Sequence, residues 1–174
     1  VRSGAVKRIQ DVRTLRARQF PEDAGPLAHP VRPASYIEIN NFYTATVYEK
    51  GAELVRMIQT IVGKDAFGKG VRRYLSDNDG RAATVEDFVA AMEAESDADL
   101  SHFMEWYGQA GTPSVAIEKN YDESSARCSL TFKQTNALTP GQDQIRPLHI
   151  PVRLGLLDKA GQEMPRCLDG EKPT

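Results

Sequence analysis

The chain has 174 residues, of which 40% are hydrophobic, so it is long enough to build the core of one ordinary domain or parts of two. Its formal net charge of -2 argues against a surface devoted to nucleic acid, because such domains usually carry a marked basic excess. No apolar run approaches the roughly 20 residues of a membrane span, and no segment has the order of a signal peptide. We therefore expect a cytoplasmic globular chain whose partners include neither nucleic acid nor a membrane.

The N-terminal segment predicts a helix followed by an irregular connector. From Gly4 to about Phe20, apolar residues recur every three residues or so, which is typical of a helix. Four prolines then follow within a short distance, and each fixes its own φ and favours extended geometry in the residue before it. We expect a stiff connector from Pro21 to Ala34, and a short extended segment that includes Tyr36, Ile37 and Ile39.

A long helix is expected next, starting at Asn40 or Asn41 as the N-cap and ending near Val62. On a helical wheel one narrow arc, which we interpret as the buried stripe, holds Tyr43, Val47, Leu54, Ile58 and Ile61. Tyr48 lies roughly 100° from Val47, on the shoulder of that stripe, and Glu49 points to the opposite side. A shoulder position allows a tyrosine to bury its ring and to leave its hydroxyl at an opening.

Three further helices follow in the pattern. The first begins at Asp65, carries Phe67, Val71, Tyr74 and Leu75, and closes at Asn78-Asp79-Gly80. The second has Thr84 as its cap and Asp87 as the partner in a capping box, with Val85, Phe88, Val89 and Met92 on its inner face. The third begins near Asp97 to Asp99, buries Leu100, Phe103 and either Trp106 or Tyr107, and ends at Gly111 before Pro113.

After Gly111-Thr112-Pro113 the apolar residues alternate instead, as they do in strands. Three antiparallel strands are predicted around Val115 and Ile117, from Cys128 to Phe132, and from Leu148 to Leu156. The expected turns are Asn120-Tyr121-Asp122, Thr139-Pro140-Gly141 and a hairpin tip at Asp158-Lys159-Ala160-Gly161. So few strands rarely complete a sandwich. We therefore predict an α+β fold, with a helical part at residues 1–111 and an incomplete antiparallel β-sandwich at residues 112–174.

The chain contains no complete catalytic motif. H-E-x-x-H, a P-loop, G-x-G-x-x-G after a strand and G-x-S-x-G are all absent, and the three histidines, His29, His102 and His149, lack the spacing of zinc ligands. Cys128 and Cys167 are far apart, which favours two reduced thiols over a zinc site or a disulfide framework. Paired acids such as Glu22-Asp23 are interpreted as solvated charges. No metal ligand is predicted from these residues.

Several blocks nevertheless resemble one family. They are Ala5-Val6-Lys7-Arg8-Ile9 with Val12-Arg13, Gln19-Phe20 with Glu22-Asp23-Ala24, Ala28-His29-Pro30-Val31-Arg32-Pro33, the run from Asn40 to Glu53, Asp79-Gly80 with Ala82-Ala83-Thr84, Asp99-Leu100-Ser101-His102-Phe103, Trp106-Tyr107 and Gly111-Thr112-Pro113. Together they resemble the downstream part of the catalytic domain in the bacterial aminopeptidase N branch of the M1 (gluzincin) family of zinc metallo-aminopeptidases. The later run Pro147-Leu148-His149-Ile150-Pro151 is similar to the start of the small β-sandwich domain that follows in that family.

The resemblance implies a thermolysin-like domain that hydrolyses N-terminal residues from peptide substrates. In the family, H-E-x-x-H and a more distant glutamate bind one zinc, and an acidic motif binds the free N-terminal amine of the substrate. None of these motifs is in this sequence, so they are expected upstream of Val1. One catalytic residue maps onto the chain: Tyr48 corresponds to the tyrosine whose hydroxyl donates to the oxyanion of the tetrahedral intermediate. Tyr43, one turn earlier, either lines the substrate side-chain pocket or packs in the core.

Two hypotheses follow from these observations. In the first, the chain is a fragment of a zinc aminopeptidase, inactive and free of zinc when isolated because the zinc ligands and the general base are elsewhere. Such a fragment should expose the apolar surface that its missing part covers, and should self-associate through it. In the alternative, the chain is a self-standing, non-catalytic module for protein contacts.

Overall fold

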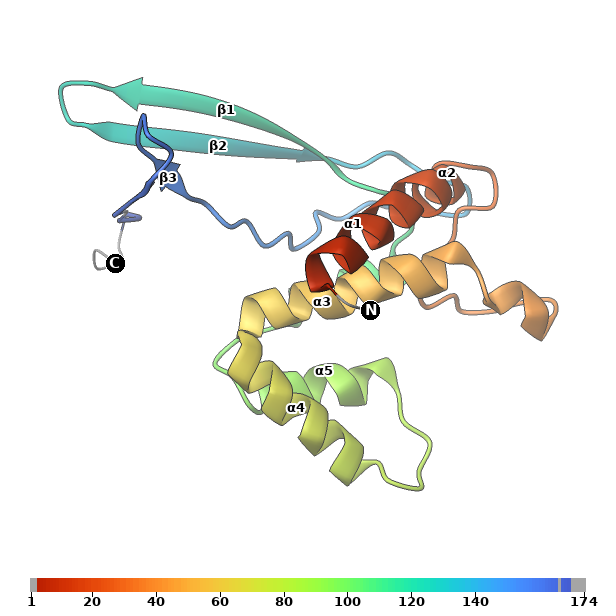
Figure 1. Ribbon diagram of the computed structural model, residues 1–174. Coiled ribbons are helices and arrows are strands. Elements are labelled where there is room, and N and C mark those ends of the chain that lie inside the picture. Colours follow the sequence, from red (N-terminus) through yellow and green to blue (C-terminus); the bar gives the residue numbers. More distant parts are fainter. Residues whose placement is uncertain (1–2, 166, 170–174) are drawn as a thin grey trace.

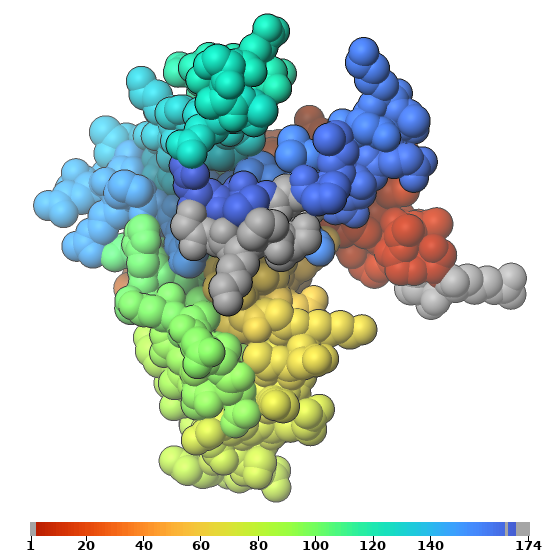
Figure 2. Space-filling model, turned by 90° about the vertical axis from the view of Figure 1, so that its left-hand side faces the viewer, coloured from red at the N-terminus to blue at the C-terminus, as the bar shows by residue number. Residues whose placement is uncertain are grey.

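The computed structural model describes residues 3–165 and 167–169. A body of helices forms one part of the molecule, and a long hairpin of two strands projects from it (Figure 1). The space-filling view shows the hairpin standing clear at one end, with α4 and α5 at the other (Figure 2). The predicted α+β class is confirmed, with helices before residue 111 and strands after it.

The N-terminal helix runs further than predicted. Helix α1 (Gly4–Thr14) continues through a π-helical turn, η1 (Leu15–Gln19), into the short helix α2 (Phe20–Asp23). The connector expected from Pro21 therefore begins only after Asp23. Pro21 is the second residue of α2, which directly follows the π turn η1.

The start of the next helix was also predicted wrongly. Glu38 has the extended backbone expected there, but the segment Ile39–Phe42 is a 3-10 turn, η2, that contains both of the asparagines considered as the N-cap. The helix begins after Thr44, whose Oγ1 accepts a hydrogen bond of 3.1 Å from the amide of Val47. It consists of a π turn, η3 (Thr46–Lys50), followed by helix α3 (Gly51–Val62).

This π turn changes which side chains are buried. The buried residues along η3 and α3 are Thr46, Lys50, Leu54 and Ile58. A π turn closes its hydrogen bonds five residues apart rather than four, so residues before it are rotated from the face that α-helical spacing assigns them. The expectation that Tyr43 lies in the buried stripe is also wrong, because Tyr43 precedes the helix and is 61% exposed. The ring of Tyr48, expected to be buried, is 57% exposed.

Helices α4 (Lys64–Asp77) and α5 (Val85–Glu93) agree with the prediction. The capping box is confirmed, because the amide of Thr84 donates to Asp87 Oδ2 at 2.8 Å and the amide of Asp87 donates to Thr84 Oγ1 at 3.2 Å. Met92 and Val89 of α5 are buried, and Phe67 and Val71 of α4 pack against the same core. Leu75, expected on that helix with the apolar residues, points outward and is exposed.

The last helical segment is shorter than predicted. It comprises a 3-10 turn, η4 (His102–Met104), and helix α6 (Glu105–Gly108), so it ends before Gly111. All four of its apolar anchors are buried, namely Leu100, Phe103, Trp106 and Tyr107. Gly111 lies beyond the helix at φ 93°, a conformation that favours glycine.

Strands β1 (Ser114–Asp122) and β2 (Arg127–Thr135) pair antiparallel, with Ile117 opposite Phe132. The turn expected at Asn120-Tyr121-Asp122 lies instead at residues 123–126. Asp122 closes it by accepting hydrogen bonds from the hydroxyls of Ser125 and Ser124 and from the amide of Ser124. These donors stabilise the ionised carboxylate and lower the pKa of Asp122 to about 2.

The third predicted strand does not form. Of the run from Leu148 to Leu156, only the last residue enters a strand, β3 (Leu156–Leu157), which pairs with β4 (Glu163–Met164). The hairpin tip between them is as expected, because the amide of Gly161 donates to the carbonyl of Asp158 at 3.0 Å. Leu148 is buried, and its amide and carbonyl bond the side-chain amide of Gln134 at 2.7 and 2.8 Å rather than a neighbouring strand.

The hydrophobic core lies in the helical body. It is built from Val31, Leu54, Ile58, Val89, Met92, Leu100, Phe103, Trp106, Tyr107 and Leu148. Leu148 is the member contributed from beyond the first hairpin, which ties that later segment to the helices. Over residues 3–165 and 167–169, every helix is too short or too polar to cross a membrane.

Two glycines on α4 provide a matched test of its packing against α5. A Cβ on Gly68 would meet only the Arg72 guanidinium at 3.8 Å, so Gly68→Ala should raise the free energy of unfolding by about 0.5–1 kcal/mol through helix propensity. A Cβ on Gly70 would lie 2.6 Å from Met92 Sδ and 3.1 Å from the carbonyl of Ala91. Because Met92 is fully buried and has little room to move aside, Gly70→Ala should lower the free energy of unfolding by about 1 kcal/mol net.

Urea denaturation of the two variants and the parent chain measures both effects. Equal stabilisation by the two substitutions would show that α4 and α5 do not pack as closely as the structure has them.

Candidate functional site

The two tyrosines predicted as site residues lie together on the surface. Tyr48 is at the centre of the π turn η3, and Tyr43 precedes the helix. Their ring centroids are 6.3 Å apart with an angle of 33° between the planes. The structure thus brings the predicted pair together, and exposes both rings rather than one hydroxyl.

Two more aromatic rings extend this pair. The ring of Phe42 is 6.0 Å from that of Tyr43, and the ring of Tyr36 is 6.1 Å from that of Phe42, both edge to face. The row from Tyr36 to Tyr48 lies at the end of α3 that is remote from α4 (Figure 1). Sequence reasoning assigned no function to Phe42 and Tyr36, although four aromatics within thirteen residues were a signal for such a row. Exposed aromatic rings suit ligand contact, because each has an apolar body and tyrosine adds a polar tip.

Beneath the π turn lies a buried ion pair. Lys50 Nζ donates to Asp23 Oδ2 at 2.9 Å and to the carbonyl of Gly111 at 3.0 Å, and it lies 5.8 Å from the ring centroid of Trp106. Asp23 also accepts from the amide of Gly111 at 2.7 Å and from Thr112 Oγ1 at 2.9 Å. The side chain of Asp23 is fully buried, so its interpretation as a solvated charge is wrong.

The electrostatics of this pair follow from its burial and its partners. Burial alone would raise the pKa of Asp23, but the charge and hydrogen bond of Lys50 and the amide of Gly111 outweigh it, so the pKa of Asp23 is lowered. Burial lowers the pKa of Lys50, and the facing carboxylate opposes that effect. We take Asp23 to be ionised, since it accepts from three separate donors, and its charge keeps Lys50 protonated.

A second set of contacts holds the first residue of the π turn. The amide of Thr46 donates to Glu22 Oε1 at 2.7 Å, and Gln19 Nε2 donates to Thr46 Oγ1 at 3.4 Å. Gln19 and Thr46 are both buried. The segment Gln19 to Asp23, at the junction of η1 and α2, therefore contacts both ends of η3.

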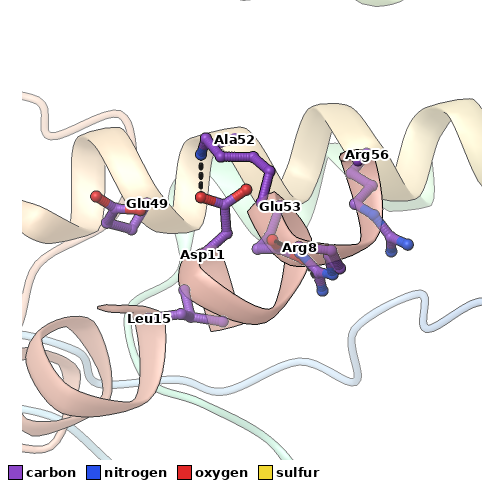
Figure 3. Close-up of a pocket in the computed structure, with 9 residues that line it drawn as sticks. Arg8, Asp11, Leu15, Glu49, Ala52, Glu53 and Arg56 are labelled. Atoms are coloured by element: carbon purple, nitrogen blue, oxygen red, sulfur yellow. Dashed lines mark hydrogen bonds and ion pairs between the residues drawn. The ribbon is translucent and has the colours of Figure 1, made fainter. Parts of the chain in front are cut away.

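A groove of about 450 Å³ lies between α1 and the helix η3–α3 (Figure 3). Its charged lining residues are Lys7, Arg8, Asp11, Glu49, Glu53 and Arg56. Arg8 and Glu53 face each other across it, with Arg8 Nη2 2.9 Å from Glu53 Oε2. Glu49 lines this groove, and neither Tyr48 nor Tyr43 is among its lining residues. The charges of both signs in this groove are largely paired with each other, so it is not the site that the tyrosines suggest.

The histidines serve local structure. His102 Nε2 lies 2.8 Å from the carbonyl of Pro147, and the ring of His102 stacks on that of His149 with centroids 6.1 Å apart. His29 Nδ1 lies 2.8 Å from the carbonyl of Pro30. Among the residues that the structure describes, no three or more His, Cys, Asp or Glu side chains are grouped so as to hold a metal ion. The residues present therefore do not fit a zinc centre of their own.

The site provides one hydrogen-bond donor and an apolar surface beside it. The phenol of Tyr48 is a neutral hydrogen-bond donor on an exposed edge, and aromatic rings beside it provide an apolar wall. Within the described part of the chain, no nucleophile with an adjacent general base accompanies it. The arrangement suits one donor and one wall of a larger site.

Comparison with known proteins identifies the family. The family model described as the peptidase family M1 domain matches residues 5–107, and one described as a domain of unknown function with an Ig-like fold matches residues 111–172. Aminopeptidase N of Escherichia coli (strain K12) is 52% identical over 163 residues, which are 94% of this chain and 19% of that protein. Aminopeptidase N of Haemophilus influenzae (strain ATCC 51907 / DSM 11121 / KW20 / Rd) is 48% identical over 169 residues, 97% of this chain and 19% of that protein.

A solved structure has the same fold over most of the chain. The crystal structure of Legionella pneumophila aminopeptidase A in complex with aspartic acid matches with a TM-score of 0.67 and 29% sequence identity, over 88% of this chain and 19% of that chain. The chain thus spans about a fifth of the length of the relatives named here. Because the M1 model matches more than half of its residues, the chain belongs to peptidase family M1.

Proposed function

We propose that the chain is part of a zinc-dependent, cytoplasmic aminopeptidase that removes N-terminal residues from peptides. Residues 1–111 are then the helical part of a thermolysin-like catalytic domain, and residues 112–174 the start of a small β-sandwich domain. The observation that carries the proposal is the exposed phenol of Tyr48 in a chain of family M1. The turn that bears Tyr48 is anchored by the buried ion pair of Lys50 with Asp23.

Two observations support the boundary at Gly111. The structure changes from helices to strands there, with α6 ending at Gly108 and β1 beginning at Ser114. The two family models meet at the same place, because one ends at residue 107 and the other begins at residue 111. The last residues of the proposed second domain, 170–174, lie outside the described part of the chain.

Tyr48 is the proposed catalytic residue. Its hydroxyl donates a hydrogen bond to the oxyanion that develops when the carbonyl of the scissile peptide bond is attacked. A preorganised donor of this kind contributes on the order of 100- to 1000-fold in rate, because it meets charge that is present only in the transition state.

Tyr43 is the proposed substrate-binding residue. Its large exposure argues against the alternative of core packing, and the contact of its ring with that of Tyr48 supports a position beside the reacting bond. In this role the ring packs against the side chain of the substrate's first residue.

Zinc in such an enzyme would polarise the substrate and activate water. The described residues of this chain offer no group that could hold it, and its sequence lacks H-E-x-x-H. Its ligands therefore belong to parts of the whole protein that this sequence does not include, as the one-fifth coverage of the relatives supports. The alternative of a self-standing interaction module is not favoured, because relatives named as aminopeptidases match nearly the whole chain.

The role of Tyr48 is tested in the whole enzyme by Tyr48→Phe, which removes the hydroxyl and keeps the ring. We expect kcat to fall on the order of 100- to 1000-fold with little change in KM, since the donor acts on the transition state. Tyr121→Phe, the same change at an exposed residue of β1, is the matched control and should leave kcat unaltered. A kcat for Tyr48→Phe within twofold of the parent enzyme would refute the role.

The isolated chain should neither retain zinc nor turn over substrate, because the metal ligands and the general base are not among its residues. Metal analysis by mass spectrometry after exposure to zinc, and hydrolysis of an aminoacyl anilide, measure this. The whole enzyme in the same assays is the positive control. Stoichiometric zinc together with turnover by the isolated chain would contradict the proposal.

The isolated chain should also self-associate, with a second copy covering apolar residues that another part of the protein covers in the whole enzyme. Ile37, Leu27 and Leu138 are 97%, 80% and 69% exposed, and they represent a larger set of exposed apolar side chains. Light scattering over a concentration series should show a mass that rises above that of one chain. A mass that stays at 19.3 kDa throughout would count against this proposal.

A further inference from the structure

The π turn η3 is held at both of its ends and free at its centre. Its first residue, Thr46, donates its amide to Glu22 Oε1 at 2.7 Å, and its last, Lys50, donates to Asp23 Oδ2 at 2.9 Å. Thr46 and Lys50 are buried, whereas Tyr48 between them is exposed. Among the described residues the Tyr48 hydroxyl has no hydrogen-bond partner, and its ring lies 6.3 Å from that of Tyr43. The direction of the Tyr48 hydroxyl therefore depends on the backbone of the turn.

The ion pair at the end of the turn joins three segments of the chain. Asp23 ends α2, Lys50 ends η3, and Gly111 with Thr112 precedes β1. Asp23 accepts from Lys50, from the amide of Gly111 at 2.7 Å and from Thr112 Oγ1 at 2.9 Å. The carbonyl of Gly111 in turn accepts from Lys50 at 3.0 Å. A shift of any of these segments would carry the π turn with it.

The energetics favour a geometric role for this pair. Buried ion pairs commonly stabilise a protein no more than apolar residues of the same volume would, because both charges lose their water. A π turn is also a rare backbone conformation that occurs mostly as single turns, often at functional sites. The ion pair and its four directional hydrogen bonds specify one position of the turn. An apolar contact would allow the turn to shift.

We propose that Asp23 and Lys50 are positioning residues for Tyr48. By fixing the end of η3 against α2 and Gly111, they hold the Tyr48 hydroxyl where the oxyanion develops. This inference rests on the proposed function of Tyr48 as a hydrogen-bond donor.

The test uses the whole enzyme and the double variant Asp23→Leu/Lys50→Met, which replaces both charges by apolar side chains and leaves neither unpaired. We expect kcat to fall on the order of tenfold to a hundredfold with KM little changed, because a displaced donor weakens binding of the transition state alone. In a Tyr48→Phe background the same double variant should have almost no further effect on kcat, since the hydroxyl that it positions is already gone.

The matched control is Arg8→Met/Glu53→Leu, which removes the ion pair between α1 and α3 without touching either end of the π turn. It should leave kcat at the parent value in both backgrounds. A fall in kcat for this control as large as that for Asp23→Leu/Lys50→Met would show that loss of any ion pair near the helix suffices, and would overturn the inference.

The outcomes separate this inference from the function on which it rests. If Tyr48→Phe alone leaves kcat unchanged, the proposed role of Tyr48 fails and the inference falls with it. If Tyr48→Phe lowers kcat but the folded double variant does not, or lowers it equally in the Tyr48→Phe background, only the inference is overturned.

Should the double variant not fold, Thr112→Val decides the question, because it removes one hydrogen bond to Asp23 and no charge. A two- to fivefold fall in kcat, about the effect of one hydrogen bond, that vanishes in the Tyr48→Phe background supports the inference. An unchanged kcat overturns it.

Discussion

The buried contact between Asp23 and Lys50 is the constraint on which the arrangement of the molecule depends. Three segments meet at it: the end of the N-terminal helix, the π turn before α3, and the glycine that separates helices from strands. Taking both charges out of water is costly, and the structure offsets that cost by giving each of them several partners. The contact therefore tolerates little variation in geometry, and the elements that leave it have fixed starting directions.

An element could be predicted from sequence when the interactions that form it join residues close together in the chain. Helices α4 and α5 were predicted closely, because their apolar spacing and the capping box of Thr84 with Asp87 act over a few residues. The buried face of η3 was not, although Leu54 and Ile58 of α3 are buried as the helical wheel predicts. A helical wheel assumes one period throughout, and no residue pattern within Thr46–Lys50 announces a π turn. Tyr48 lies inside this turn, so the wheel misplaces its ring, whereas Tyr43 precedes the helix and no helical wheel applies to it.

The β region shows the same limit at longer range. The hairpin β1–β2 needs only its own alternation and a turn closed by Asp122, and it formed as expected apart from the position of that turn. The segment from Leu148 has equally good alternation, yet its backbone bonds the side chain of Gln134, and its buried leucine joins the helical core. Pro147 precedes this segment and Pro151 lies within it, and because neither has an amide donor they disfavour a regular ladder there.

The site residues could not be identified from local sequence patterns. Spacing alone places no significance on Tyr48, and the acidic pair Glu22-Asp23 looks solvated, so resemblance to the M1 family was needed to single out the tyrosine. The structure brings parts of that resemblance together in space. Three of the blocks that carry it, Glu22-Asp23-Ala24, the run through Lys50, and Gly111-Thr112-Pro113, are far apart in sequence and meet at one buried contact. Loss of Asp23 would leave Lys50 as an unpaired buried charge, and loss of Lys50 would do the same to Asp23. Asp23, Lys50 and Gly111 thus depend on one another through the same contact that ends the turn bearing Tyr48.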